Sequence, residues 1–233
     1  MIEYTLIRSR RRTAEIHIIN RGVEVRAPMK MPKRDIDKFV ASKENWINKK
    51  IARSISNAEQ REAFILAYSD SVKLRGKEYP LTAKNGKRAG FDGERFYLPP
   101  DLSPTQIKSV IKQIYRYLAN PHLTERVTHY AELMKVSPAA VKINGARKRW
   151  GSCSAKKSLN FSWRLVMADD EVIDYVVVHE LAHINEMNHS ARFWAIVAGV
   201  LPDYGERQKK LGALQKRLNA EDWEDSTKPY AAE

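Results

Sequence analysis

A histidine-rich segment late in the chain carries the residues with the clearest capacity for chemistry. Residues 179–189 read H-E-L-A-H-I-N-E-M-N-H, which is H-E-x-x-H with a third histidine six residues later. Positions i and i+4 of a helix lie on one face, so His179 and His183 can bind one metal ion. Three imidazole nitrogens and a water form the open tetrahedral site of a catalytic zinc. Glu180 adjoins the first histidine and can take a proton from such a water.

The residues before this segment indicate that it lies on a buried helix. Residues 172–178 are almost all apolar, and a helix that is apolar all round belongs in a protein core. Because burying unpaired polar groups is costly, a buried helix does not normally carry H-E-x-x-H. The alternative is a surface helix with two solvated histidines. The acidic residues at 169–171 suit the positive end of the expected helix.

His189 is the candidate for a third metal ligand. Asn188 tolerates the left-handed conformation that ends many helices, and Ser190 is a good N-cap for a new helix. The chain is therefore expected to turn over residues 187–190, which would swing His189 back towards the metal. Otherwise His189 is a hydrogen-bonded residue in a turn between two helices.

Two known zinc-peptidase patterns are compared with this segment. The metzincin pattern shares the histidine spacing, but it needs glycine where this chain has Glu186, and no methionine follows Met187 to make its later turn. The gluzincin pattern takes a carboxylate from a following helix, where Glu206 is the best candidate. Because basic residues surround Glu206, a solvated surface charge is the simpler interpretation.

Basic residues are concentrated before the histidine-rich segment. The stretch 142–164 contains no acidic residue and seven basic ones: Lys142, Arg147, Lys148, Arg149, Lys156, Lys157 and Arg164. In zinc-peptidase-like folds, the strand expected over 159–166 would run beside the active-site cleft. Lys148, Arg149 and Arg164 are therefore expected to bind a substrate carboxylate or phosphate. A solvated basic face is the alternative, since charge patterns are weakly diagnostic.

Length and composition indicate a globular protein with anionic partners. The chain has 233 residues, 43% hydrophobic and 30% charged, which is enough to bury a sizeable core. Its net charge of +13 favours anionic partners, which are nucleic acid, nucleotides, acidic peptides or a membrane surface. The first residues contain no secretory apolar segment, and no apolar run is long enough to span a membrane. We therefore expect a cytoplasmic protein without a membrane partner; its oligomeric state stays open.

The single cysteine, Cys153, excludes an internal disulfide framework and suits a reducing cytoplasm. A lone cysteine is most often a small buried hydrophobe. Cys153 could instead be a fourth metal ligand or a redox-sensitive thiol.

Apolar periodicity and turn residues divide the chain into two expected parts. Residues 1–100 form a β-rich basic region with one helix, and residues 101–233 form the core that carries the histidines. Asn120-Pro121 is expected to break a long helix. The expected elements are a three-stranded meander over 3–27, hairpins within 71–100, strands over 140–144 and 159–166, and helices over 33–55, 104–119 and 204–218.

Three stretches together resemble the YgjP-like metallopeptidase-domain family. They are R-W-G-S-C-S at 149–154, H-E-L-A-H at 179–183 and N-H-S-A-R-F-W at 188–194. The basic N-terminal part and the helix containing Trp46 also look like that family. The resemblance implies an α+β fold with a zincin-like core, in which helices pack on a small antiparallel or mixed sheet. It also implies that the three histidines bind the metal and that Glu180 is the catalytic acid and base.

Three functions fit these residues. The first is a zinc-dependent hydrolase of metallopeptidase type, in which Glu180 takes a proton from water and returns it to the leaving amine. The second is a nucleoside-triphosphate pyrophosphohydrolase that uses the same site, with basic residues holding the phosphates. The third is a nucleic-acid-associated protein-processing factor, which the basic N-terminal part motivates. One zinc ion is expected as the cofactor, although other divalent metals would also fit.

Overall fold

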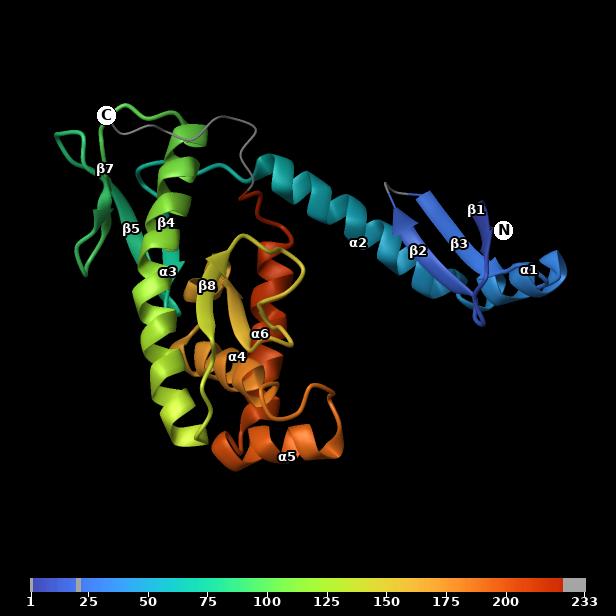
Figure 1. The fold of residues 1–233 in the computed structure, drawn as a ribbon. Coiled ribbons are helices and arrows are strands. Elements are labelled where there is room, and N and C mark those ends of the chain that lie inside the picture. Colours follow the sequence, from blue (N-terminus) through green and yellow to red (C-terminus); the bar gives the residue numbers. More distant parts are fainter. Residues whose placement is uncertain (1, 20–21, 224–233) are drawn as a thin grey trace. The chain divides into compact units, whose positions relative to one another are not determined.

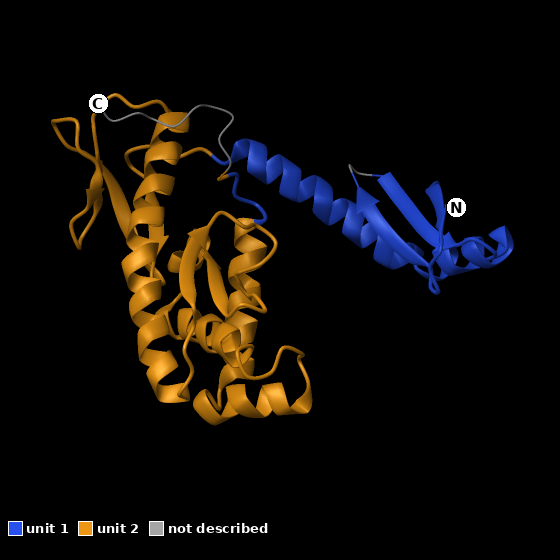
Figure 2. Cartoon of the chain, in the orientation of Figure 1, with its two compact units in different colours: residues 1–64, 219–222 blue, residues 65–218, 223–233 orange. Residues whose placement is uncertain are grey.

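The computed structural model describes residues 2–19 and 22–223, and the chain forms two compact units (Figure 2). The first contains the chain up to Phe64 together with Asn219–Asp222, and the second contains Ile65–Leu218 and Trp223. Helices and small mixed sheets make this an α+β protein, as expected. The strands within 71–98 belong to the second unit. The expected division into domains at residue 100 remains a prediction.

The described residues of the first unit form a three-stranded sheet and two helices (Figure 1). Its elements are β1 (Thr5–Ser9), β2 (Glu15–Ile19), β3 (Gly22–Pro28), α1 (Lys33–Ser42) and α2 (Glu44–Ala63). The expected meander is wrong, because β1 pairs in parallel with β3 and the sheet order is β1-β3-β2. Val23, Val25 and Ala27 of β3 are buried, so the strand with the most buried side chains lies between two less buried edge strands.

Two helices replace the single helix expected over 33–55. The helical path breaks at Lys43, whose dihedral angles are φ −109° and ψ 8°. Ile36 and Val40 of α1 and Ile47 of α2 belong to the same buried cluster as Val25 of β3. The break at Lys43 therefore allows both helices to bury apolar side chains in one core. Helix α2 continues to Ala63, beyond residue 55, where the expected helix ends.

Two small sheets lie within residues 65–223 of the second unit. The first has the order β4-β5-β7-β6, and the second has the order β8-β10-β9. In the second sheet β8 and β10 are parallel, whereas β9 is an edge strand antiparallel to β10. The strands are β4 (Ser71–Leu74), β5 (Lys77–Ala83), β6 (Gly90–Phe91), β7 (Phe96–Leu98), β8 (Ala140–Asn144), β9 (Gly151–Cys153) and β10 (Ser158–Ser162).

One long helix runs the length of the second unit (Figure 1). The helices are α3 (Pro104–Met134), η1 (Trp163–Met167), α4 (Asp170–Ala182), α5 (Ala191–Val200) and α6 (Tyr204–Leu218). The expected break at Asn120-Pro121 is wrong, since α3 continues through Pro121. Proline removes one backbone donor from a helix. Ala119 and Leu123 on either side are fully buried, so tertiary packing outweighs this local cost.

The strand expected over 159–166 is shorter in the structure. It ends at Ser162, and residues 163–167 form the 3₁₀ helix η1. The N–H of Ser162 still donates to the carbonyl of Trp150, but the N–H of Ala168 donates to the carbonyl of Leu165 and closes the turn. The turn directs the chain into α4.

Polar and aromatic contacts join α3 to the rest of its unit. Arg126 of α3 donates two hydrogen bonds to the carboxylate of Asp174 on α4, at 2.6 and 2.9 Å. Tyr115 of α3 stacks on Trp163 with centroids 5.8 Å apart, and Trp223 lies edge-on to both rings. The Arg126–Asp174 pair therefore ties α3 to the helix that carries the histidines, and the aromatic contacts tie α3 to η1. Among the described residues, no helix has the length and apolar character needed to cross a membrane.

Candidate metal centre

Helix α4 positions the first two histidines. Asp170 and Glu171 in its first turn complement the positive end of the helix dipole. Residues 172–178 are all buried, so the surrounding core fixes the orientation of the helix. His179 lies in the last turn, and His183 is the C-cap with helical dihedral angles of φ −63° and ψ −17°. Both side chains therefore stay on one face, as the i, i+4 spacing requires.

The turn between α4 and α5 carries His189. Helix α4 ends at Ala182, earlier than Asn188, and the turn after it is tightened by i to i+3 hydrogen bonds from the N–H groups of Ile184 and Asn185. Ser190 is the N-cap of α5, as expected, and its hydroxyl accepts a hydrogen bond from the N–H of Phe193 at 3.3 Å. The cap fixes the chain immediately after His189.

The three histidines come together at the end of α4. One nitrogen from each of His179, His183 and His189 lies within 4.8 Å of the other two. The Nε2 atoms of His179 and His189 are 3.0 Å apart. Two nitrogens bound to one zinc at its usual distances are roughly 3.3 Å apart in a tetrahedral site. This set of donors therefore fits a single divalent ion.

The protonation of the histidines suits metal binding. Burial, together with the charges of the other two histidines, lowers the pKa of His179 to about 4. Burial also lowers the pKa of His183. Nδ1 of His183 lies 3.1 Å from the carbonyl oxygen of Glu186, which leaves its Nε2 for an ion. Nδ1 of His179 is buried and has no hydrogen-bond partner in the described part of the chain.

Aromatic side chains of α5 support the histidine rings. The ring centroid of Phe193 lies 4.6–4.9 Å from the centroid of each of the three histidines, and Phe193 is fully buried. Trp194 lies 5.8–5.9 Å from His179 and His189 and stacks on Tyr204 of α6. Close packing of this kind restricts the rotation of the imidazoles.

Glu180 lies against the edge strand β9. Its side chain is buried, and burial raises its pKa to about 7. The positive charge of Arg149 and a hydrogen bond from the backbone N–H of Cys153 act in the opposite direction. A Cβ atom at Gly151 would lie only 2.6 Å from Cγ and Oε1 of Glu180. The absence of a side chain at Gly151 therefore makes room for the carboxylate.

The loop before β9 is held at both ends. Arg164 of η1 is 7% exposed; it donates to the carbonyl of Gly145 at 2.9 Å and stacks on Trp163. The hydroxyl of Ser162 donates to the carbonyl of Ala146 at 2.8 Å. The N–H of Ser162 binds the other end of the loop at residue 150. Residues 147–149 between these anchors are exposed and basic.

The expected substrate-binding residues therefore occupy different settings. Lys148 and Arg149 are exposed on the anchored loop, and the charge of Arg149 reaches Glu180. Arg164 is buried and anchors the loop, which favours a structural role. Contact of all three with substrate remains a prediction. Within the described residues, the group of possible metal ligands contains the three histidines and neither Cys153 nor Glu206.

The sequence alone did not predict two contacts of this site. Phe193 supports the histidine rings, and Gly151 touches Glu180. The position of Phe193 three residues after the N-cap Ser190 was a usable signal, because the first turn of α5 must lie beside His189. No local signal connects Gly151 with Glu180, since 29 residues separate them along the chain.

Comparison with known proteins adds a family match. The family model described as YgjP-like, metallopeptidase domain, matches residues 12–213. No curated protein matches the chain. The metallopeptidase zymogen of Pyrococcus abyssi abylysin is 21% identical, with a TM-score of 0.37 over 39% of this chain and 92% of that one. The metallopeptidase zymogen of Methanocaldococcus jannaschii jannalysin is also 21% identical, with a TM-score of 0.36 over 39% of this chain and 94% of that one. TM-scores this low carry no argument about function.

Proposed function

The chain belongs to the YgjP-like family of metallopeptidase domains, and on this premise we propose that it is a zinc-dependent hydrolase of the peptidase type. The observation that carries the proposal is the convergence of three histidines, the first of which directly precedes the buried Glu180 in α4. His179, His183 and His189 would hold one ion, and three neutral imidazoles suit zinc. When bound, the ion would lower the pKa of a water molecule and polarise the scissile carbonyl.

Glu180 is the proposed general acid and base. With a pKa raised to about 7 by burial, it can both accept and release a proton at neutral pH. It takes a proton from the attacking water and returns the proton to the leaving amine. Contact with Gly151 and the hydrogen bond from Cys153 keep the carboxylate in one position.

Lys148 and Arg149 are the proposed contacts for an anionic group of the substrate. Both are exposed on a loop whose ends are hydrogen-bonded to the core. Arg149 is close enough to Glu180 to lower its pKa, so a group held there would lie near the reacting atoms. We infer that acidic peptides are cleaved faster than basic ones.

The variant Glu180→Gln tests the proposed mechanism. Turnover of an unfolded protein substrate should fall by about 10²–10⁴-fold, because a general base contributes that much, while the zinc content stays at one ion per chain. The matched control is Glu206→Gln, an exposed position on α6, which should leave activity and zinc content unchanged. Full activity of zinc-loaded Glu180→Gln would refute the mechanism. Loss of zinc in Glu206→Gln would make that carboxylate a ligand.

The same assay separates the alternative substrates. The anchored basic loop is also compatible with nucleoside triphosphates, whose phosphates it would hold. If pyrophosphate is released from a nucleotide only when Glu180 is present, and unfolded protein is not cleaved, the substrate is a nucleotide and not a peptide. Association of the basic N-terminal part with nucleic acid is a separate prediction, and salt-sensitive binding to DNA would support it.

A further inference from the structure

A groove lies between the four-stranded sheet and the first half of α3, within the second unit (Figure 1). Its volume is about 760 Å³, which is in the range of ligand-binding sites. Residues 87–91 and Tyr97 line its sheet side, and residues of α3 between 110 and 118 line the other side. The lining includes none of the three histidines, Glu180 or the basic loop at 147–149, so the groove is distinct from the candidate metal centre.

Two aromatic rings on the sheet side of the groove are held in place by packing. The ring centroid of Phe91 lies 4.8 Å from that of Tyr79 and 4.9 Å from that of Phe96. Tyr97 of β7 pairs with Gly90 of β6, and a Cβ atom at Gly90 would lie 2.6 Å from the hydroxyl oxygen of Tyr97. The ring of Tyr97 therefore lies against the backbone of β6. The aromatic side of the groove is thus formed before any ligand binds.

Tyr117 of α3 supplies a third ring, and this ring is open to a ligand. Tyr117 is 78% exposed, and among the described residues it makes no hydrogen bond or ring contact. Val110 and Ile114, which lie on the same face of the helix and also line the groove, are buried. An aromatic side chain at the edge of a groove can stack on a planar group of a ligand.

The charged residues that line the groove are both cations. Lys87 and Arg88 are exposed on the loop between β5 and β6, and no carboxylate is among the lining residues. Neither cation forms an ion pair within the part of the chain that the structure describes. Nζ of Lys84 lies 4.5 Å from the centroid of the Tyr97 ring, which places a third positive charge next to the groove. The groove therefore attracts an anion.

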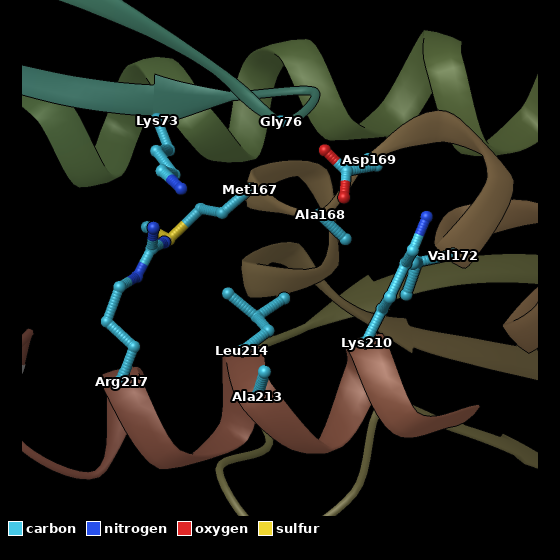
Figure 3. A pocket seen from close by; sticks show the side chains of 10 residues that line it. All are labelled: Lys73, Gly76, Met167, Ala168, Asp169, Val172, Lys210, Ala213, Leu214 and Arg217. Carbon is cyan, nitrogen blue, oxygen red and sulfur yellow. The ribbon is translucent and has the colours of Figure 1, made fainter. Parts of the chain in front are cut away.

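The cavity at the start of α4 has a different balance of charge (Figure 3). Asp169 is among its lining residues, and Lys210 there forms an ion pair with Glu171. A ligand in that cavity would meet charges of both signs. By contrast, residues 79–91 and 102–124, which include the sheet side and the helix side of the groove, contain no acidic residue. The groove is therefore the better site for an anionic partner.

A single strand of nucleic acid matches both the charge and the rings of the groove. Its phosphates complement Lys87 and Arg88, and its unpaired bases can stack on Tyr117. The bases of a duplex are already stacked on one another, so they cannot cover this ring. An acidic peptide would complement the two cations but would leave the exposed ring unused.

We propose that this groove binds a single-stranded segment of nucleic acid, with a base stacked on Tyr117 and its phosphates on Lys87 and Arg88. The proposal does not depend on the proposed hydrolase activity. It is also separate from the predicted association of the basic N-terminal part with nucleic acid, because the groove lies within the second unit.

Fluorescence anisotropy of a labelled oligothymidylate of about ten nucleotides measures binding to the full chain. Tyr117→Ala should weaken binding about tenfold because the stacking is lost, whereas Tyr117→Phe keeps the ring and should bind like wild type. Lys87→Gln and Arg88→Gln should each weaken binding and reduce the slope of log affinity against log salt concentration by about 0.7, as expected for one lost phosphate contact. The matched control is Lys209→Gln, an exposed position on α6, which should change neither quantity.

Photocrosslinking locates the bound strand on the chain. An oligothymidylate with one 5-bromouracil forms a covalent bond to a stacked aromatic side chain under ultraviolet light. Mass spectrometry should identify Tyr117 as the crosslinked residue. The control variant is Trp46→Ala, which removes an exposed ring from the first unit and should leave this crosslink unchanged.

Several results would overturn the proposal. They are the absence of binding, equal affinity of Tyr117→Ala and wild type, and crosslinks that occur only within residues 1–64. Equal affinity for duplex DNA, or equally tight binding of polyglutamate of the same charge, would show that the groove recognises charge alone and would also overturn it. Loss of binding in His179→Ala would place the strand at the metal centre. Retained binding in His179→Ala, with activity lost, separates this proposal from the proposed function.

Discussion

Replacing Gly151 with alanine tests whether the edge strand β9 determines the position of Glu180. The added Cβ atom would lie 2.6 Å from Cγ and Oε1 and 2.8 Å from Cδ of Glu180. Carbon atoms normally approach to about 3.5–4.0 Å, so the side chain must retreat by roughly 1 Å or the strand must move away. Either movement takes the carboxylate out of the position that it holds against β9.

The size of the effect follows from this displacement. A misplacement of about 1 Å in a catalytic group can reduce the rate by about 10²-fold. Forcing one extra carbon into a packed site costs about 1–3 kcal/mol of stability. We therefore expect Gly151→Ala to lower kcat/KM by about two orders of magnitude while the protein stays folded. The zinc content should not change, because the three atoms nearest to the added Cβ all belong to Glu180.

Two control variants separate displacement of Glu180 from general damage. Gly212→Ala in α6 adds a Cβ atom with no neighbour within 4 Å, so it should keep full activity and raise stability by up to about 1 kcal/mol. Glu180→Asp shortens the side chain and loses activity by itself. Since the shorter side chain no longer meets the new Cβ, adding Gly151→Ala to Glu180→Asp should cause little further loss.

The reasoning fails if Gly151→Ala keeps wild-type kcat/KM, because the contact with Glu180 would then have no functional consequence. It also fails if the double variant loses kcat/KM by the product of the losses in Gly151→Ala and Glu180→Asp. Loss of zinc from Gly151→Ala would show that the damage reaches the histidines instead.

Three other predictions follow from contacts within the second unit. Phe193→Ala should weaken zinc binding by about 10–100-fold, measured in competition with a chelating dye, because the three imidazoles lose their common support. The control variant Phe193→Leu should keep most of the affinity, and equal affinities in the two variants would contradict the prediction. Arg126→Met should lower the free energy of unfolding in urea by about 3 kcal/mol, since it leaves the carboxylate of Asp174 buried without its cation. Arg75 lowers the pKa of Asp170, so this pair stabilises the fold above about pH 4, and the contribution is lost as the pH falls through the lowered pKa. Asp170→Asn should therefore reduce stability at pH 7 by at most about 1 kcal/mol, because both side chains are about half exposed, and the difference from wild type should vanish near pH 2.

The histidine cluster could be predicted from the sequence because its geometry is local. His179 and His183 are one helical turn apart, and His189 follows after a short turn that ends at the cap residue Ser190. Helix spacing and capping therefore bring the three rings together without knowledge of the remaining fold. Their role as metal ligands, and that of Glu180 as acid and base, remain predictions.

The elements that were predicted wrongly depend on contacts between distant parts of the chain. Pro121 reads locally as a helix break, but buried neighbours on both sides keep α3 continuous. The residues of β1 read as the first strand of a meander, but β1 pairs in parallel with β3 instead of with its neighbour along the chain. Local propensity is a weak prior, and packing outweighs it at these positions.

The place of Trp223 decides where the chain can be shortened. Its indole lies 5.6 Å from the ring of Tyr115 and 6.0 Å from that of Trp163, yet Asn219–Asp222 just before it are grouped with the N-terminal unit. A fragment that stops at Leu218 would contain all three histidines and Glu180, but it would lack the indole that packs edge-on against Tyr115 and Trp163. Expression of the histidine-bearing half alone therefore needs an end point beyond Trp223, and the fluorescence of this indole would report whether the core has closed.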